Sequence, residues 1–221
     1  LGLVAQDFEK EKVRFDELFT GWRRLQVPGA EVDAFYAQKY RDAKDVGFFP
    51  NEFAILENVG DPKHTAVARY DAKQGRLVQL SADRNSAWNV RPRSVEQRMA
   101  LELLLDDDVK LVTLVGQAGT GKTLLALASA LQRVVRDQKY SKVLVTRPVM
   151  PLGRDIGYLP GSMEAKMSHW MQPIFDNLKY LLSGRLRPGK ETAEDLLARG
   201  VVELEALTYI RGRSIAEQFI I

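Results

Sequence analysis

The chain has 221 residues, of which 45% are hydrophobic and 28% charged, so it can form one large globular domain or two small ones. It contains no cysteine, which excludes disulfides, thiolate metal sites and a cysteine nucleophile. The net charge of +3 permits contact with nucleic acid without arguing for it. No apolar run is long enough to cross a membrane and the first residues do not resemble a signal peptide, so we expect a cytoplasmic location without membrane contact.

The first 88 residues are predicted to form a small β-rich linker or accessory domain. Short β-prone stretches alternate with turn signals, which is typical of a small antiparallel sheet or an open barrel. These stretches are residues 52–57, 65–70 and 76–80. A helix is predicted at 32–44, and residues 4–25 are expected to form a strand or a short helix. His64 is expected to be a surface or packed histidine rather than a metal ligand.

Residues 89–221 are predicted to form an α/β domain. Ser94 is a good N-cap for a helix that runs to Leu105, and the acidic triplet 106–108 is expected to be a solvated cluster rather than a metal site. Further helices are predicted at 124–131, 164–182 and 191–199, and strands at 111–115, 143–146, 201–204 and 219–221. This alternation of strands and helices implies a parallel sheet with helices on both faces.

Residues 116–123 are the most informative stretch, because they fit the phosphate-loop pattern G-x-x-x-x-G-K-S/T between a predicted strand and a predicted helix. The glycines of such a loop let backbone N–H groups point at an anion, and the helix adds its positive dipole end. Lys122 is expected to contact the β- and γ-phosphates of a nucleotide, and Thr123 to offer its hydroxyl to Mg²⁺. The predicted nucleotide-binding residues here are Gly116, Gln117, Ala118, Gly119, Thr120, Gly121, Lys122, Thr123 and Leu124.

Gln97 lies upstream of this loop, near the start of the helix that Ser94 caps. A glutamine amide donates and accepts hydrogen bonds at once, which suits the N6 and N7 edge of adenine. A helical glutamine that faces solvent is the alternative.

Arginine and aromatic side chains after the second predicted strand are candidates for contact with nucleic acid. Arg147 stands at the carboxyl end of that strand, the edge at which parallel sheets bind ligands. The glycine- and proline-rich loop 151–161 carries Arg154, suited to a backbone phosphate, and Tyr158, suited to base stacking, as is Trp170. A structural connection explains this loop equally well.

Arg211 and Arg213 flank a glycine and form a third candidate. Such a pair suits a phosphate contact or a finger that reaches the nucleotide of a neighbouring subunit. A solvated turn is the alternative.

These motifs in this order resemble the PhoH family of P-loop ATPases, which are similar to the RecA-like motor core of superfamily 1 helicases. The matching stretches are residues 96–101, 112–127, 145–148, 151–161 and 209–214. Residues 50–53 are similar to the segment that joins a PIN ribonuclease domain to the ATPase in fused members. The resemblance implies ATP and Mg²⁺ as cofactors, RNA unwinding coupled to a PIN domain, single-stranded RNA as a partner and a hexameric ring. It also implies that Gln97 reads adenine.

The chain departs from the family pattern in three places. The 221 residues include no stretch that resembles a PIN domain, and they do not reach the family's Walker B Asp and Glu. His169 stands where the family more often has Pro. We therefore expect a piece of a longer protein that binds ATP with little hydrolysis of its own.

Two other readings of the phosphate loop stay open. A P-loop kinase that phosphorylates a small molecule uses the same loop. A nucleotide-gated ring-assembly module, in which a partner does the chemistry, is the non-enzymatic alternative. A GTPase is disfavoured, because the chain carries no N-K-x-D guanine motif.

Overall fold

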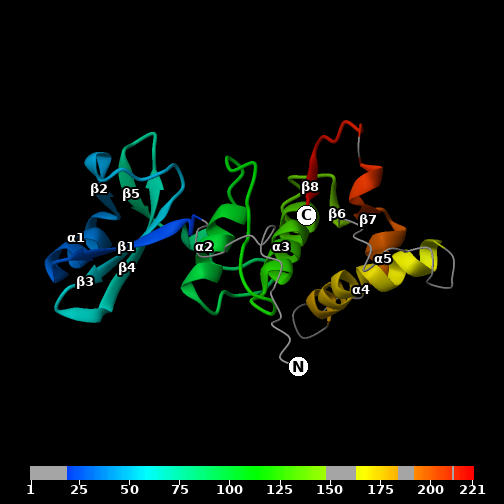
Figure 1. The fold of residues 1–221 in the computed structure, drawn as a ribbon, viewed down its shortest axis with the longest axis horizontal. Helices are drawn as coiled ribbons and strands as arrows, with labels where there is room; N and C mark the ends of the chain where they lie inside the picture. Colours follow the sequence, from blue (N-terminus) through cyan, green and yellow to red (C-terminus); the bar gives the residue numbers. More distant parts are fainter. Residues whose placement is uncertain (1–18, 148–162, 184–191, 211) are drawn as a thin grey trace, which may run out of the picture. The chain divides into compact units, whose positions relative to one another are not determined.

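The structure, a computed structural model, describes residues 19–147, 163–183, 192–210 and 212–221, with backbone alone at 163–170. The chain divides into two compact units, Leu1–Leu80 and Ser81–Ile221. Figure 1 shows their elements in chain order, the first unit in blue to cyan and the second in green to red. No helix in these described ranges is both long and apolar enough to cross a membrane.

From residue 19 on, where its description begins, the first unit is a five-stranded sheet with one α-helix. Its elements are β1 (Trp22–Val27), α1 (Gly29–Gln38), β2 (Tyr40–Asp42), β3 (Phe53–Asn58), β4 (Asp61–Asp71) and β5 (Arg76–Gln79). The strand order is β1-β3-β4-β5-β2, in which β1 runs parallel to β3 and the other neighbours are antiparallel. Four successive residues of β3 are buried, as expected of a strand covered on both faces. The predicted β-rich character of this region is confirmed, but the sheet is mixed rather than purely antiparallel, because β1 and β3 are parallel.

The predicted helix at 32–44 is wrong at both ends. The helix α1 begins at Gly29 and buries Val32 and Phe35 against the sheet. It ends at Gln38 because Lys39 adopts a left-handed backbone, with φ at 69°. A left-handed residue cannot continue a right-handed helix, and the next residues form β2 instead.

The second unit combines a three-stranded parallel sheet with four α-helices among its described residues. The strands are β6 (Lys142–Arg147), β7 (Val202–Ala206) and β8 (Gln218–Ile220), in the order β7-β6-β8. The helices are α2 (Val95–Leu104), α3 (Lys122–Leu131), α4 (Met163–Leu182) and α5 (Ala193–Ala198). Two buried residues of β6, Val143 and Val145, pack with buried residues of α3 and α4 in one apolar core. The predicted α/β fold with a parallel sheet is confirmed.

Trp88 is buried in the core of the second unit. Its side chain has no exposed surface, and its indole Nε1 donates to the carbonyl of Leu181 at the end of α4, at 3.0 Å. The structure divides after Leu80, whereas the sequence predicts the boundary at residue 88. The difference has a physical reason, because the eight residues that follow Leu80 include this core side chain.

The strand predicted at 111–115, directly before the phosphate loop, is not formed. These residues pair with no described strand, and Leu111 and Val115 are 84% and 60% exposed. An apolar, β-branched run has the propensity for a strand, but a ladder also needs a neighbouring strand to pair with.

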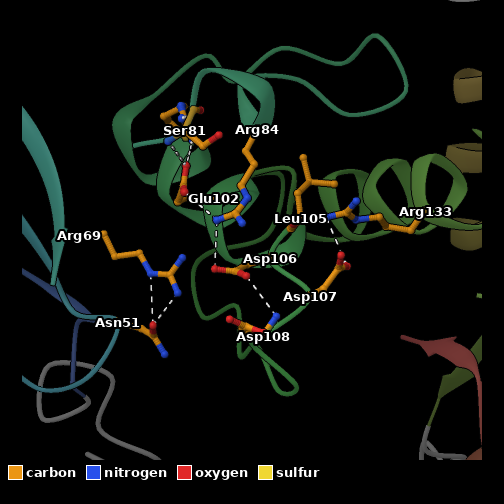
Figure 2. A network of polar contacts seen from close by, with 11 residues as sticks. Asn51, Arg69, Ser81, Arg84, Glu102, Leu105, Asp106, Asp107, Asp108 and Arg133 are labelled. Carbon is orange, nitrogen blue, oxygen red and sulfur yellow. Dashed lines mark hydrogen bonds and ion pairs between the residues drawn. The ribbon is translucent and has the colours of Figure 1, made fainter. Parts of the chain in front are cut away.

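Of the acidic triplet after α2, which was expected to be solvated, Asp106 and Asp107 pair with basic side chains, whereas Asp108 is exposed. Asp106 accepts from Arg84 at 3.0 Å (Figure 2). Asp107 accepts from Lys139 at 2.8 Å. The hydrogen bond from Lys139, with added attraction from Arg133, lowers the pKa of the Asp107 carboxyl. The triplet therefore ties the end of α2 to other segments of the second unit.

Candidate nucleotide-binding site

The phosphate loop leads into α3 through two glycines with left-handed backbones. Gly119 has φ at 80°, and Gly121, the N-cap of α3, has φ at 85°. Residues with a Cβ are strained in this region, so both turns favour glycine. The Thr120 side chain between them donates to the carbonyl of Gln117 at 2.9 Å, which closes the loop on itself.

The ammonium group of Lys122 lies inside the loop. Its Nζ donates to the carbonyls of Gly116 at 2.8 Å and Gln117 at 2.7 Å, and it lies 3.3 Å from the hydroxyl of Thr120. The positive charge is therefore held at the concave side of the loop, where a phosphate oxygen can replace these neutral acceptors with a stronger, charge-assisted bond.

The first turn of α3 supplies further donors. The N–H of Leu125 is the first to bond within the helix, to the carbonyl of Gly121 at 2.9 Å. The N–H groups of Lys122, Thr123 and Leu124 precede it and have no carbonyl within the helix to accept them. Orphan N–H groups and the positive end of the helix dipole together attract an anion. Thr123 is exposed here, so its hydroxyl can reach an ion that a bound phosphate brings.

Gln97 joins α2 to the phosphate loop. Its Nε2 donates to the carbonyl of Thr120 at 3.1 Å, and its Oε1 accepts from the N–H of Arg93 at 2.7 Å. The Ser94 side chain accepts from the N–H of Gln97 at 3.2 Å, which confirms the predicted N-cap. The sequence placed Gln97 on the right helix, and the structure brings it against the loop, although 23 residues separate it from Thr120.

A buried polar cluster around Glu102, on the same helix as Gln97, was not predicted from the sequence. Glu102 of α2, with its side chain 4% exposed, accepts hydrogen bonds from Arg84, Arg98 and the N–H of Ser81 (Figure 2). The only signal for it in the sequence is the i, i+4 spacing of Arg98 and Glu102 on one helix face. The contacts to residues 81 and 84 have no local signature.

Of two predicted arginines, Arg147 ends β6 and Arg213 pairs with a residue near the carboxyl end of the neighbouring strand β7. Arg147 is the exposed last residue of β6 and pairs in register with Ala206 of β7. Arg213 forms an ion pair with Glu205 of β7, which raises the pKa of its guanidinium. Glu205 was not singled out from the sequence, because eight residues and a turn separate it from Arg213.

The remaining candidates lie outside the described residues. These are Arg154, Tyr158 and Arg211, together with the side chains of His169 and Trp170. The other histidine, His64, contacts Asp33 at 3.1 Å and is 31% exposed, in agreement with a surface role.

The donors of the site fit a nucleoside triphosphate with Mg²⁺. Lys122 and the orphan N–H groups of α3 match the negative oxygens of a phosphate chain, and one hydroxyl, that of Thr123, faces outward beside them. Across the described ranges, no cluster of three or more histidine, aspartate or glutamate side chains is placed to hold a metal ion. Mg²⁺ at phosphate loops is bound through substrate phosphates and few protein ligands, so Thr123 is its one candidate ligand here.

Comparison with known proteins matches residues 89–221 to the PhoH-like protein family. Protein PhoH2 of Bacillus subtilis is 45% identical over 225 residues, which cover 100% of this chain and 50% of that protein. Protein PhoH2 of Mycolicibacterium smegmatis is 37% identical over 222 residues, covering 100% of this chain and 48% of that protein. A PhoH-like protein of Mycobacterium leprae is 32% identical over 132 residues, 60% of this chain and 35% of that protein. The chain therefore spans about half the length of the PhoH2 relatives it matches.

Proposed function

Because the chain belongs to the PhoH family of P-loop proteins, we propose that its second unit is the ATP-binding and ATP-hydrolysing motor domain of a PhoH-like protein. The observation that carries the proposal is the convergence of Lys122 and Gln97 on one loop. Lys122 contacts the loop at Gly116 and Gln117, and Gln97 contacts it at Thr120. The ammonium group of Lys122 and the amide of Gln97, which can pair with adenine, thus contact the same phosphate loop.

Each residue then has a defined task. Lys122 and the first N–H groups of α3 bind the β- and γ-phosphates and hold them against the helix N-terminus. Thr123 would hold Mg²⁺ through its hydroxyl, and the ion would neutralise the charge that develops on the phosphates. Gln97 presents one amide hydrogen and one carbonyl lone pair to adenine, since each of its bonds to the protein uses only part of its capacity.

We further propose that ATP turnover drives the unwinding of RNA, coupled to a PIN ribonuclease domain, within a hexameric ring. Support comes from the placement of Arg147 and Arg213 at the carboxyl edge of the parallel sheet, where ligands of such folds bind. Arg147 suits a phosphate of single-stranded RNA. Arg213 suits either RNA or the nucleotide of a neighbouring subunit, once its ion pair with Glu205 opens.

The test is ATP hydrolysis by the protein as its gene encodes it, with and without single-stranded RNA, single-stranded DNA and small metabolites. The proposal predicts phosphate release that RNA stimulates and that Lys122→Ala abolishes. Phosphate transfer to a metabolite would support a kinase instead. Nucleotide-dependent ring formation without RNA-stimulated turnover would support an assembly module.

A further inference from the structure

The buried carboxylate of Glu102 accepts from three donors, two in the turn at 81–84 and one on α2 itself. Its Oε2 accepts from the N–H of Ser81 at 3.0 Å and from Arg98 at 2.9 Å, and its Oε1 accepts from Arg84 at 3.0 Å. Figure 2 shows this carboxylate between Ser81 and Arg84, with Asp106 on the far side of the Arg84 guanidinium. The two arginines and two carboxylates balance in charge, so the cluster is neutral as a whole.

Two side chains of α2 form hydrogen bonds with the backbone of a single residue, Ser81. Glu102 binds the N–H of Ser81, and Arg98 donates to its carbonyl at 2.6 Å. Arg98 and Glu102 also pair with each other, one helical turn apart. Ser81 is the first residue of the second unit, directly after the chain leaves the first. We call Ser81, Arg84, Arg98 and Glu102 the α2 clamp.

The apolar contacts of α2 fix its position less sharply than the α2 clamp does. The helix has ten residues, and its buried apolar side chains are Met99 and Leu101, followed by Leu105 at its end. Apolar packing is non-directional and tolerates small shifts, whereas a carboxylate with three donors has one good geometry. Burying such charges brings little net stability, and the best-attested use of buried polar groups is to specify one arrangement.

The α2 clamp adjoins the residue that touches the phosphate loop. Arg98 directly follows Gln97 in α2, and the Gln97 amide reaches Thr120 at 3.1 Å. A rotation or slide of α2 by a fraction of an ångström moves the Gln97 amide relative to the loop. The same motion leaves Lys122 in place, because Lys122 belongs to α3 and its bonds are to the loop itself.

We propose that Glu102 and Arg98 are positioning residues for Gln97, and that through it they set the affinity of the site for the adenine base but not for the phosphates. This inference rests on the proposed function, since it assumes that Gln97 reads adenine. Glu102 contacts no ligand itself and acts only by fixing α2 against Ser81.

The experiment measures, by calorimetry on the full chain with Mg²⁺, the affinity for ATP and for inorganic tripolyphosphate, which lacks the base. Glu102→Gln keeps the size of the side chain but removes its charge. We expect ATP binding to weaken about fivefold to tenfold, as for the loss of one hydrogen bond, while tripolyphosphate binding stays within about twofold. Gln97→Ala should give the same pattern. The double variant should bind ATP no more weakly than Gln97→Ala alone, because both changes remove the same contact.

The matched control is Glu203→Gln, which breaks an ion pair with Lys142 elsewhere in the second unit and should change neither affinity. Arg98→Lys keeps the charge but lacks the forked guanidinium, whose two nitrogens bind Glu102 and Ser81 separately, so it provides a milder variant should Glu102→Gln fold poorly. Equal weakening of both ligands by Glu102→Gln, or additive losses in the double variant, would overturn the positioning role. If Lys122→Ala leaves the affinity for tripolyphosphate unchanged, the proposed phosphate site is itself wrong. That outcome is distinct from failure of the positioning role.

Discussion

The side-chain amide of Gln97 donates to the backbone carbonyl of Thr120 at 3.1 Å, and this bond ties α2 to the phosphate loop. The amide oxygen of Gln97 is held in turn by the N–H of Arg93 at 2.7 Å. Both ends of the amide are thus oriented before any base arrives, while one hydrogen and one lone pair remain for it. Pre-orientation of this kind lowers the entropy lost on binding.

The same contact makes Gly121 a sensitive position. Gly121 and Gly119 have similar left-handed backbones, so an alanine at either costs about 1–2 kcal/mol of strain. A Cβ at Gly121 would also lie 3.2 Å from the Nε2 of Gln97, whereas a Cβ at Gly119 meets nothing within 4 Å. We therefore expect Gly121→Ala to lower the free energy of unfolding more than Gly119→Ala, as measured by urea titration. The excess should vanish in a Gln97→Ala background, and an excess that persists there would refute the contact.

Trp88 should be the most sensitive tryptophan of the chain among those the structure describes with side chains. Trp88→Phe removes the indole donor from the buried carbonyl of Leu181 and leaves a gap in the core, so we expect a loss of about 2 kcal/mol in the free energy of unfolding. Trp22→Phe, at a partly exposed position in the first unit, should cost less than about 1 kcal/mol. Equal losses in the two variants, measured by denaturant unfolding, would show that Trp88 does not anchor α4.

The stability of the first unit should depend on pH through Glu52. This carboxylate is 3% exposed and accepts two bonds from Arg23, at 2.6 and 2.9 Å, and one from the N–H of Phe49. The bonds from Arg23 lower the pKa of Glu52 from its ordinary value of 4.5. A carboxyl whose folded pKa is lowered adds stability above its unfolded pKa, and this stability is lost as the pH falls through the folded pKa.

Arg23→Ala should therefore cost about 2 kcal/mol at pH 7, with a difference from the parent chain that shrinks below about pH 4.5. Thermal unfolding between pH 3 and pH 7 measures the loss of stability at pH 7 and its decrease at lower pH. Arg41→Ala, which breaks the more exposed pair with Glu31, should cost about 0.5 kcal/mol or less. A cost of Arg23→Ala that is the same at pH 3 and pH 7 would contradict this role for Glu52.

Features encoded by neighbouring residues were predictable from the sequence. The phosphate loop, the N-cap at Ser94 and the strands β3, β4 and β5 each depend on a short run of residues with a clear pattern. The end of α1 at Lys39 was not predictable, because a lysine carries no signal for a left-handed backbone.

Features that depend on pairing between distant segments were missed. Residues 111–115 have strand composition, yet a strand forms only where a partner lies alongside. The ion pair of Arg213 with Glu205 and the contact of Glu102 with Ser81 likewise join segments whose approach is decided by the fold as a whole. For Gln97, the helix was predictable from neighbouring residues, whereas the contact with the distant Thr120 was not.

The proposed function depends above all on Lys122, which we expect to bind the phosphates of ATP in the loop that Gln97 contacts at Thr120. Calorimetric titration of the chain with Mg²⁺-ATP tests it most directly, using Lys122→Ala and, as a control, Lys179→Ala, which removes an exposed lysine that pairs with Glu194. We expect at least about tenfold weaker binding for Lys122→Ala and unchanged binding for Lys179→Ala. Binding of Mg²⁺-ATP by Lys122→Ala with the affinity of the parent chain would contradict it.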